Sequence, residues 1–184
     1  MSDFLAQINQ LLTSAIVITG LALLLYILTY NRQSDVTRAF AALLGCVIIV
    51  YVVDLIVFPL ETFAHTAPWL RLQWMGIALA PPAYLHFSTT LLGTTNARHH
   101  YSDWIVRLNY VLGGVVLLLA LTTNQIVSEP QTVTYPFHLK GGPAFGFFAV
   151  YYFVTVAWGA VNINRARRRC LTSTSRRRMA YAAI

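Results

Sequence analysis

The chain has 184 residues, of which 57% are hydrophobic and only 10% are charged, and its formal net charge is +7. Its mean hydropathy is +0.60. Ordinary soluble domains carry about a quarter of their residues as charged side chains, so this composition excludes a soluble globular protein, because lipid must cover much of a surface so poor in charge.

Five apolar runs follow one another along the chain. Each is long enough to cross a bilayer as a helix, which needs about 20 residues. They cover residues 11–30, 39–60, 70–92, 104–123 and 143–163. The runs are apolar throughout rather than alternating, which excludes a membrane β-barrel. No Lys or Arg precedes Arg32 and the first run is too long for a cleaved signal peptide. The sequence therefore predicts an all-α, polytopic helical membrane protein with five transmembrane helices within residues 1–164.

The basic residues favour one orientation of this bundle. Arg32 and Arg38 follow the first run, and Arg98 follows the third, with Arg107 a little inside the fourth. The opposite side carries a mixed set of charges: Asp3, Glu61, Arg71, Glu129 and Lys140. Short cytoplasmic loops hold the excess of Lys and Arg. We therefore expect a plasma-membrane protein whose N-terminus lies outside the cell.

Residues 165–184 form a separate segment that is rich in arginine. Its arginines are Arg165, Arg167, Arg168, Arg169, Arg176, Arg177 and Arg178. We expect this segment to lie in the cytoplasm and to attract anionic inner-leaflet lipid, and we expect no nucleic acid partner. The segment ends in "MAYAAI". A basic flank followed by apolar residues favours the start of a sixth helix in a longer protein over a short interfacial tail.

Ionisable residues at membrane depth are costly and usually face protein or water. Asp54 is the only acidic residue well inside an apolar run, and it lies near the outer end of the second run. Arg71 begins the third run on the same side of the membrane. Two interpretations remain open. Asp54 and Arg71 form an ion pair that holds two helices together, or they form the polar floor of an outward-facing ligand pocket with His65, Trp69, Gln73 and Trp74 nearby.

The third run has unusual residues in its middle. Pro81 and Pro82 each lack an N–H and collide with the carbonyl one turn back, which predicts a kink or break and a candidate hinge. Gly76 with Ala80, and Ala41 with Gly45 in the second run, predict close approach of neighbouring helices. His86 lies about fifteen residues into the run, which is ~22 Å along a helix. We expect it to be a buried polar group that bonds a neighbouring carbonyl or hydroxyl.

No catalytic or metal-binding set emerges from the sequence. It contains no Ser/His/Asp arrangement at plausible depth, no pair of carboxylates and no phosphate-binding loop. Cys46 and Cys170 are too far apart to pair and show no metal-ligand spacing. A haem would need a second histidine facing His86, and no other histidine falls within a predicted helix at that depth. We therefore expect no cofactor, no metal and no enzymatic activity of this chain by itself. The outer loop over residues 124–142 is long enough for a short hairpin or a lid.

Three segments carry a family resemblance. The third run, "WLRLQWMGIALAPPAYLHFSTTLLG", has alanine-proline followed by a histidine-phenylalanine pair. The fifth opens on glycine-proline, as in "GGPAFGFFAVYYF", and "RARRRCLTSTSRRRMAYAAI" precedes a sixth helix. In this order the chain resembles the N-terminal seven-transmembrane sensor region of bacterial and archaeal histidine kinases. The resemblance implies a membrane-embedded sensory input module of a two-component system that detects an external or bilayer-dissolved signal. Kinase activity would come from a cytoplasmic domain outside this sequence.

A second interpretation belongs to a different class. The chain would then be a non-catalytic structural transmembrane subunit of a larger respiratory or photosynthetic complex. The aromatic side chains of the fifth run would suit such contacts: Phe145, Phe147, Phe148, Tyr151, Tyr152 and Phe153. A transporter is less well supported, since no inverted repeat or pair of broken helices is visible. A homodimer or other membrane subunits remain open as partners.

Overall fold

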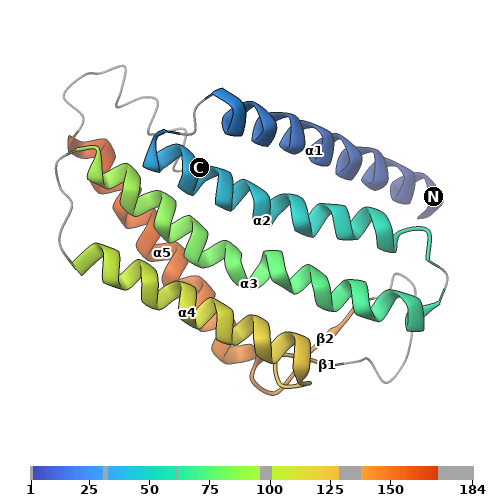
Figure 1. Ribbon diagram of the computed structural model, residues 1–184. Helices are drawn as coiled ribbons and strands as arrows, with labels where there is room; N and C mark the ends of the chain where they lie inside the picture. The colour runs from blue at the N-terminus through green and yellow to red at the C-terminus, as the bar shows by residue number, and fades with distance from the viewer. Residues whose placement is uncertain (1, 31–32, 61, 96–100, 129–137, 170–184) are drawn as a thin grey trace.

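The computed structural model describes residues 2–30, 33–60, 62–95, 101–128 and 138–169. The described chain is built from helices and one small antiparallel sheet (Figure 1). In chain order the elements are α1 (Ser2–Tyr30), α2 (Asp35–Val57), α3 (Phe63–Gly93), α4 (Tyr101–Thr122), β1 (Val127–Ser128), β2 (Lys140–Gly141) and α5 (Phe145–Arg169). The predicted all-α polytopic fold is confirmed. The predicted start of a sixth helix lies outside the described residues.

Four helices meet the length and hydropathy that a membrane crossing requires. These spans are Gln7–Tyr30, Asp35–Val57, Asp103–Thr122 and Phe145–Arg169. The remaining helix, α3, is the longest at 31 residues but is less apolar than α1, α2 and α4. Its position explains this difference, because α3 packs against α2, α4 and α5 while α1 packs on the far side of α2 (Figure 1). The side chains of α3 therefore meet protein more than lipid.

The bundle has two ends that differ in character. We call the end where α2 and α4 stop and α3 and α5 begin the hairpin end, because β1 and β2 lie there (Figure 1). The two strands pair antiparallel with Val127 opposite Gly141, which confirms the predicted hairpin. We call the opposite end the basic end, because the last turn of α5 carries Arg167, Arg168 and Arg169.

Small residues set the spacing between α3 and its neighbours. At Gly76 an added Cβ would overlap the Cys46 carbonyl oxygen of α2 and approach Val50 Cγ2 to 2.7 Å. The predicted close approach at Gly76 is therefore confirmed. Gly45 has no atom within 4 Å of its Cβ position, so the same prediction is wrong there: this glycine is on α2 but faces away from any close neighbour.

The two central prolines do not interrupt α3, which remains α-helical from Phe63 to Gly93. Of the two predicted alternatives, the break is therefore wrong, whereas the kink and the hinge role of Pro81 and Pro82 stay predictions. Both rings are almost fully buried. Because each proline lacks an N–H, the carbonyls one turn back lose their usual helical donor. One of them, that of Ala78, faces Gly113 of α4, where an added Cβ would lie 3.0 Å from both Ala78 O and Pro82 Cγ.

Candidate functional site

The sequence-predicted ligand residues all lie near the hairpin end, but they have different partners. Asp54, near the end of α2, is exposed. Its carboxylate accepts a hydrogen bond of 2.6 Å from the side-chain amide of Gln73, and the same amide donates to the carbonyl of Val50 at 3.2 Å. An uncharged amide on α3 therefore holds this carboxylate.

Arg71 turns in another direction, toward α4. Its guanidinium donates to the carbonyls of Ala120 and Thr123 at 3.3 and 3.4 Å, and to Asn124 Oδ1 at 2.7 Å. The last carbonyls of a helix lack intrahelical donors and lie at the negative end of its dipole, so a cation is stabilised there. Arg71 thus caps α4. The predicted ion pair between Asp54 and Arg71 is wrong, because the two charges are bonded to different helices.

Trp74 belongs to the packed interior. It is 7% exposed and forms a core cluster with Ala120, Ile126, Val127 and Phe148. Its ring meets that of Phe148 edge-on, with centroids 5.0 Å apart. This cluster joins α3, α4, the hairpin and α5, so aromatic and aliphatic side chains fill the space beside the indole.

His65 is exposed on the first turn of α3. It lies at the same end of the bundle as Trp74 but on the surface rather than in the cluster. A single ligand pocket with walls from His65, Asp54, Arg71 and Trp74 stays a prediction.

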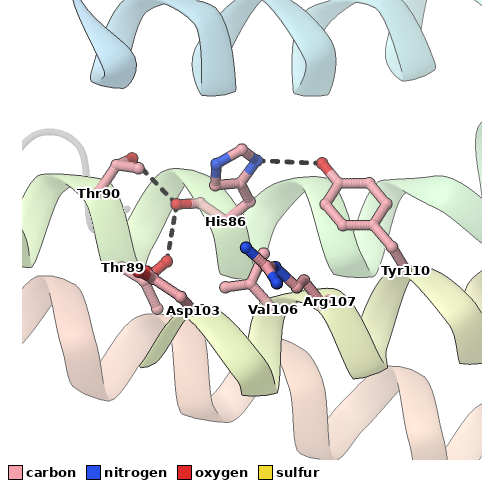
Figure 2. A pocket seen from close by; sticks show the side chains of 7 residues that line it. All are labelled: His86, Thr89, Thr90, Asp103, Val106, Arg107 and Tyr110. Atoms are coloured by element: carbon pink, nitrogen blue, oxygen red, sulfur yellow. Dashed lines mark hydrogen bonds between the residues drawn. The ribbon is translucent and has the colours of Figure 1, made fainter. Parts of the chain in front are cut away.

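A cavity that the sequence did not indicate lies between α3 and α4, near the basic end (Figure 2). Its volume is about 340 Å³, within the range of roughly 300–1,000 Å³ typical of small-ligand sites. It is lined by His86, Thr89, Thr90, Asp103, Val106, Arg107 and Tyr110. Most of these side chains are polar, which is unusual in a bundle this apolar.

Helical spacing explains why these residues converge. On α3, His86 is followed by lining residues three and four positions later. On α4, Asp103 is followed by lining residues three, four and seven positions later. Residues with these spacings share one face of a helix, and Figure 2 shows the two faces meeting. The spacing of Asp103, Val106, Arg107 and Tyr110 on α4 is visible in the sequence and indicates a shared face, although the sequence analysis used Arg107 only to predict topology.

His86 and Tyr110 form one wall of the cavity. The His86 Nδ1 lies 3.3 Å from the Tyr110 hydroxyl (Figure 2). The two rings meet edge-on with centroids 5.8 Å apart and planes at 83°. The expectation that His86 bonds a neighbouring hydroxyl is confirmed, although its side chain is only partly buried.

The threonine hydroxyls of the cavity are committed to their own helix. Thr89 Oγ1 donates to the carbonyls of Leu85 and His86 at 3.0 and 2.9 Å. Thr90 Oγ1 donates to those of His86 and Phe87, both at 2.9 Å. Such back-bonding satisfies a hydroxyl inside an apolar bundle. Because each hydroxyl has one proton, the threonines present oxygen and methyl groups to the cavity rather than donors.

Two further polar contacts join α4 to α5. The Tyr151 hydroxyl donates to the Asn109 carbonyl at 3.2 Å, and Thr155 Oγ1 donates to Asn109 Oδ1 at 3.1 Å. An asparagine inside an apolar run was a signal for this contact that the sequence reasoning did not use.

The described His, Cys, Asp and Glu side chains do not form a second candidate site. Among the residues that the structure describes, no group of three His, Cys, Asp or Glu side chains is placed to hold a metal ion. Cys46 is buried within α2, whereas Cys170 lies outside the described residues.

The family model for the N-terminal 7TM region of histidine kinase matches residues 10–184. The chain belongs to this family. The match covers nearly the whole sequence and confirms the resemblance derived from the third run, the start of the fifth and the arginine segment. No curated protein and no solved structure is detectably similar to the chain. Membership in the family, together with four apolar spans, identifies a multi-pass membrane protein and a sensory input module of a histidine kinase.

Proposed function

We propose that this chain detects an external or bilayer-dissolved signal at the hairpin end and relays it toward the basic end. In this proposal the N-terminus and the hairpin lie outside the cell, and the arginine segment lies in the cytoplasm beside anionic lipid. The chain itself does no chemistry. Phosphotransfer belongs to a kinase domain on the cytoplasmic side.

The contact that most directly supports this function is the cap that Arg71 forms on α4. It links the start of α3 to the end of α4, and the Trp74 cluster lies beside it. A signal that displaces the Arg71 guanidinium would release α4 carbonyls and loosen the contact between the helices. We propose Asp54 and His65, which are exposed, as the residues that an external signal meets first.

The relay in this proposal follows α4. That helix is bonded to α3 through Arg71 at the hairpin end and through Tyr110 near the basic end, and to α5 through Asn109, the neighbour of Tyr110 in the chain. Through these three contacts, a shift of α4 between two states would be transmitted to α3 and α5. A signal shifts the balance between two states only by its difference in affinity for them.

The test compares Arg71→Gln with Lys140→Gln in the full-length kinase reconstituted in vesicles. Both changes remove one positive charge at the hairpin end, but only Arg71 caps α4, whereas Lys140 is exposed on β2. The probes are long-chain alcohols and fatty acids as bilayer-dissolved signals, with autophosphorylation and thermal unfolding as readouts. We expect a probe that raises Tm and changes autophosphorylation in the wild type, and a response at least about fivefold smaller in Arg71→Gln.

Three outcomes would contradict the proposal. One is a stable chain whose Tm and kinase activity respond to none of the probes. Another is an equal response of Arg71→Gln and Lys140→Gln. The third is recovery of the chain only within a multi-subunit membrane complex, which would instead support the structural subunit.

A further inference from the structure

We infer that the cavity between α3 and α4 at the basic end binds the phosphate group of an anionic phospholipid, with Arg107 as the cation that contacts it. The inference is independent of how the hairpin end receives a signal.

Arg107 is a cation placed one turn inside a membrane span. The span of α4 begins at Asp103, so Arg107 lies about 6 Å further along the helix axis. A charge at this depth is costly unless it reaches water, a headgroup or a partner. The long aliphatic stem of arginine allows its guanidinium to reach the level of the phosphates while the stem stays among apolar groups.

The guanidinium of Arg107 is held by none of the residues that the structure describes. Among the described residues it forms no hydrogen bond or ion pair. Two other arginines of the described helices do have partners: Arg38 is paired with Asp35, and Arg71 caps α4. Arginine presents its donors as a planar fork that matches two oxygens of a phosphate. A donor set of this kind, lining a cavity, therefore selects an oxyanion.

Asp103 lines the same cavity and does not neutralise Arg107. The two residues are four apart on α4, a spacing that commonly gives a salt bridge, yet no salt bridge joins them, and Asp103 has its own interaction apart from Arg107. Asp103 occupies the first turn of α4, where the positive end of the helix dipole stabilises a carboxylate. Its charge is thus accommodated without Arg107. It still repels an anion, and this predicts that removing the charge of Asp103 strengthens binding.

The remaining walls suit the headgroup region of a lipid. Tyr110 and His86 hold each other through their hydrogen bond, and Val106 adds an apolar surface beside them. The volume of about 340 Å³ accommodates a headgroup and glycerol while the acyl chains remain in the bilayer. Inorganic phosphate could make the same contact with the guanidinium, but it stays in water, whereas this cavity opens within a membrane span. We therefore assign the site to a phospholipid.

The experiment titrates the detergent-purified chain with phosphatidylglycerol, phosphatidylcholine and inorganic phosphate. Bound lipid is counted by native mass spectrometry, and stabilisation is followed as Tm. We expect one phosphatidylglycerol to be retained in preference to phosphatidylcholine. Arg107→Gln should weaken this binding about tenfold, and Asp103→Asn should strengthen it. The matched control is Arg38→Gln, an exposed arginine at the same end, whose affinity should fall less than about twofold, as for a general surface charge.

Several results would overturn the inference. Equal losses in Arg107→Gln and Arg38→Gln would show general attraction to anionic lipid without a site. Saturable binding of inorganic phosphate that displaces the lipid would assign the cavity to a soluble ligand instead. If Arg107→Gln does not fold, Arg107→Lys keeps the charge but not the fork, and it should still lose severalfold in affinity. An unchanged affinity in that variant would contradict the role of Arg107.

Discussion

Gly76 marks a point where the backbones of α3 and α2 come into contact. An added Cβ would overlap the carbonyl oxygen of Cys46, which is backbone and cannot move aside without moving α2. We predict that Gly76→Ala lowers the free energy of unfolding by about 1–3 kcal/mol, the usual cost of overpacking. Reversible unfolding by SDS in mixed micelles measures this difference.

Gly45→Ala is the control for this substitution. It adds the same methyl group to α2 where nothing lies within 4 Å, so the free energy of unfolding should change by less than about 0.5 kcal/mol. Equal destabilisation by the two variants would mean that helix spacing is not the reason for Gly76.

The partners of single side chains show what could be predicted from the sequence at this scale. Hydropathy placed Asp54 and Arg71 at the same end of the bundle, which is correct. It did not show the direction in which each side chain points, since depth in a helix says nothing about rotation around its axis. Arg71 turns to α4 and Asp54 to Gln73. The bond between His86 and a hydroxyl was predicted, but its identity as that of Tyr110 required the packing of α3 on α4.

At the scale of whole elements, the apolar runs predicted the number and order of the helices but not their ends. α3 begins at Phe63, before its run, and α5 continues to Arg169, past its run. Hydropathy marks the part of a helix that lies in hydrocarbon, whereas helical hydrogen bonds continue into the polar flanks. The cavity between α3 and α4 escaped prediction for a related reason. Its residues come from two helices, and only their packing brings the two sets together.

Pro81 and Pro82 raise the question of why α3 keeps two prolines in its centre. The helix remains continuous, so the cost of the missing donors is met by packing: both rings are buried, and Gly113 of α4 lies against the carbonyl of Ala78, which has lost its helical donor. If this region is a hinge, restoring the donors should stiffen it. We predict that Pro81→Ala combined with Pro82→Ala stabilises the bundle by up to about 3 kcal/mol and reduces signalling.

Two measurements check the hinge. Hydrogen exchange should show slower exchange of the backbone amides around residues 78–86 in the double variant than in the wild type. Autophosphorylation of the full-length kinase should respond less to a stimulus. Unchanged signalling together with slower exchange would separate helix stiffness from function and would contradict the hinge.

At the scale of the whole molecule, the exposed apolar surface fits a bundle immersed in lipid. Phe147 and Phe153 on α5 are 82% and 77% exposed, while Phe148 between them is 6% exposed in the core cluster. The aromatic residues of α5 thus divide between the protein interior and the outside. Lipid accounts for the exposed set, so these side chains do not by themselves favour the structural subunit that the sequence left open.

The orientation of this bundle in the membrane is the remaining prediction. Arg38 lies near the start of α2, Arg107 lies near the start of α4, and the last turn of α5 carries further arginines, so positive charge gathers at one end. Because cytoplasmic loops retain Lys and Arg, we predict that the basic end lies in the cytoplasm and the N-terminus outside.

Single cysteines at Ser2 and Thr174, in a background with Cys170→Ser, are treated in intact cells with a membrane-impermeant maleimide. Labelling at position 2 but not at position 174 is expected, and permeabilised cells should label at both, which shows that each site is reactive. Labelling of intact cells at position 174 but not at position 2 would reverse the orientation. It would also place the lipid cavity of Arg107 in the outer leaflet and the hairpin end, with Arg71, in the cytoplasm.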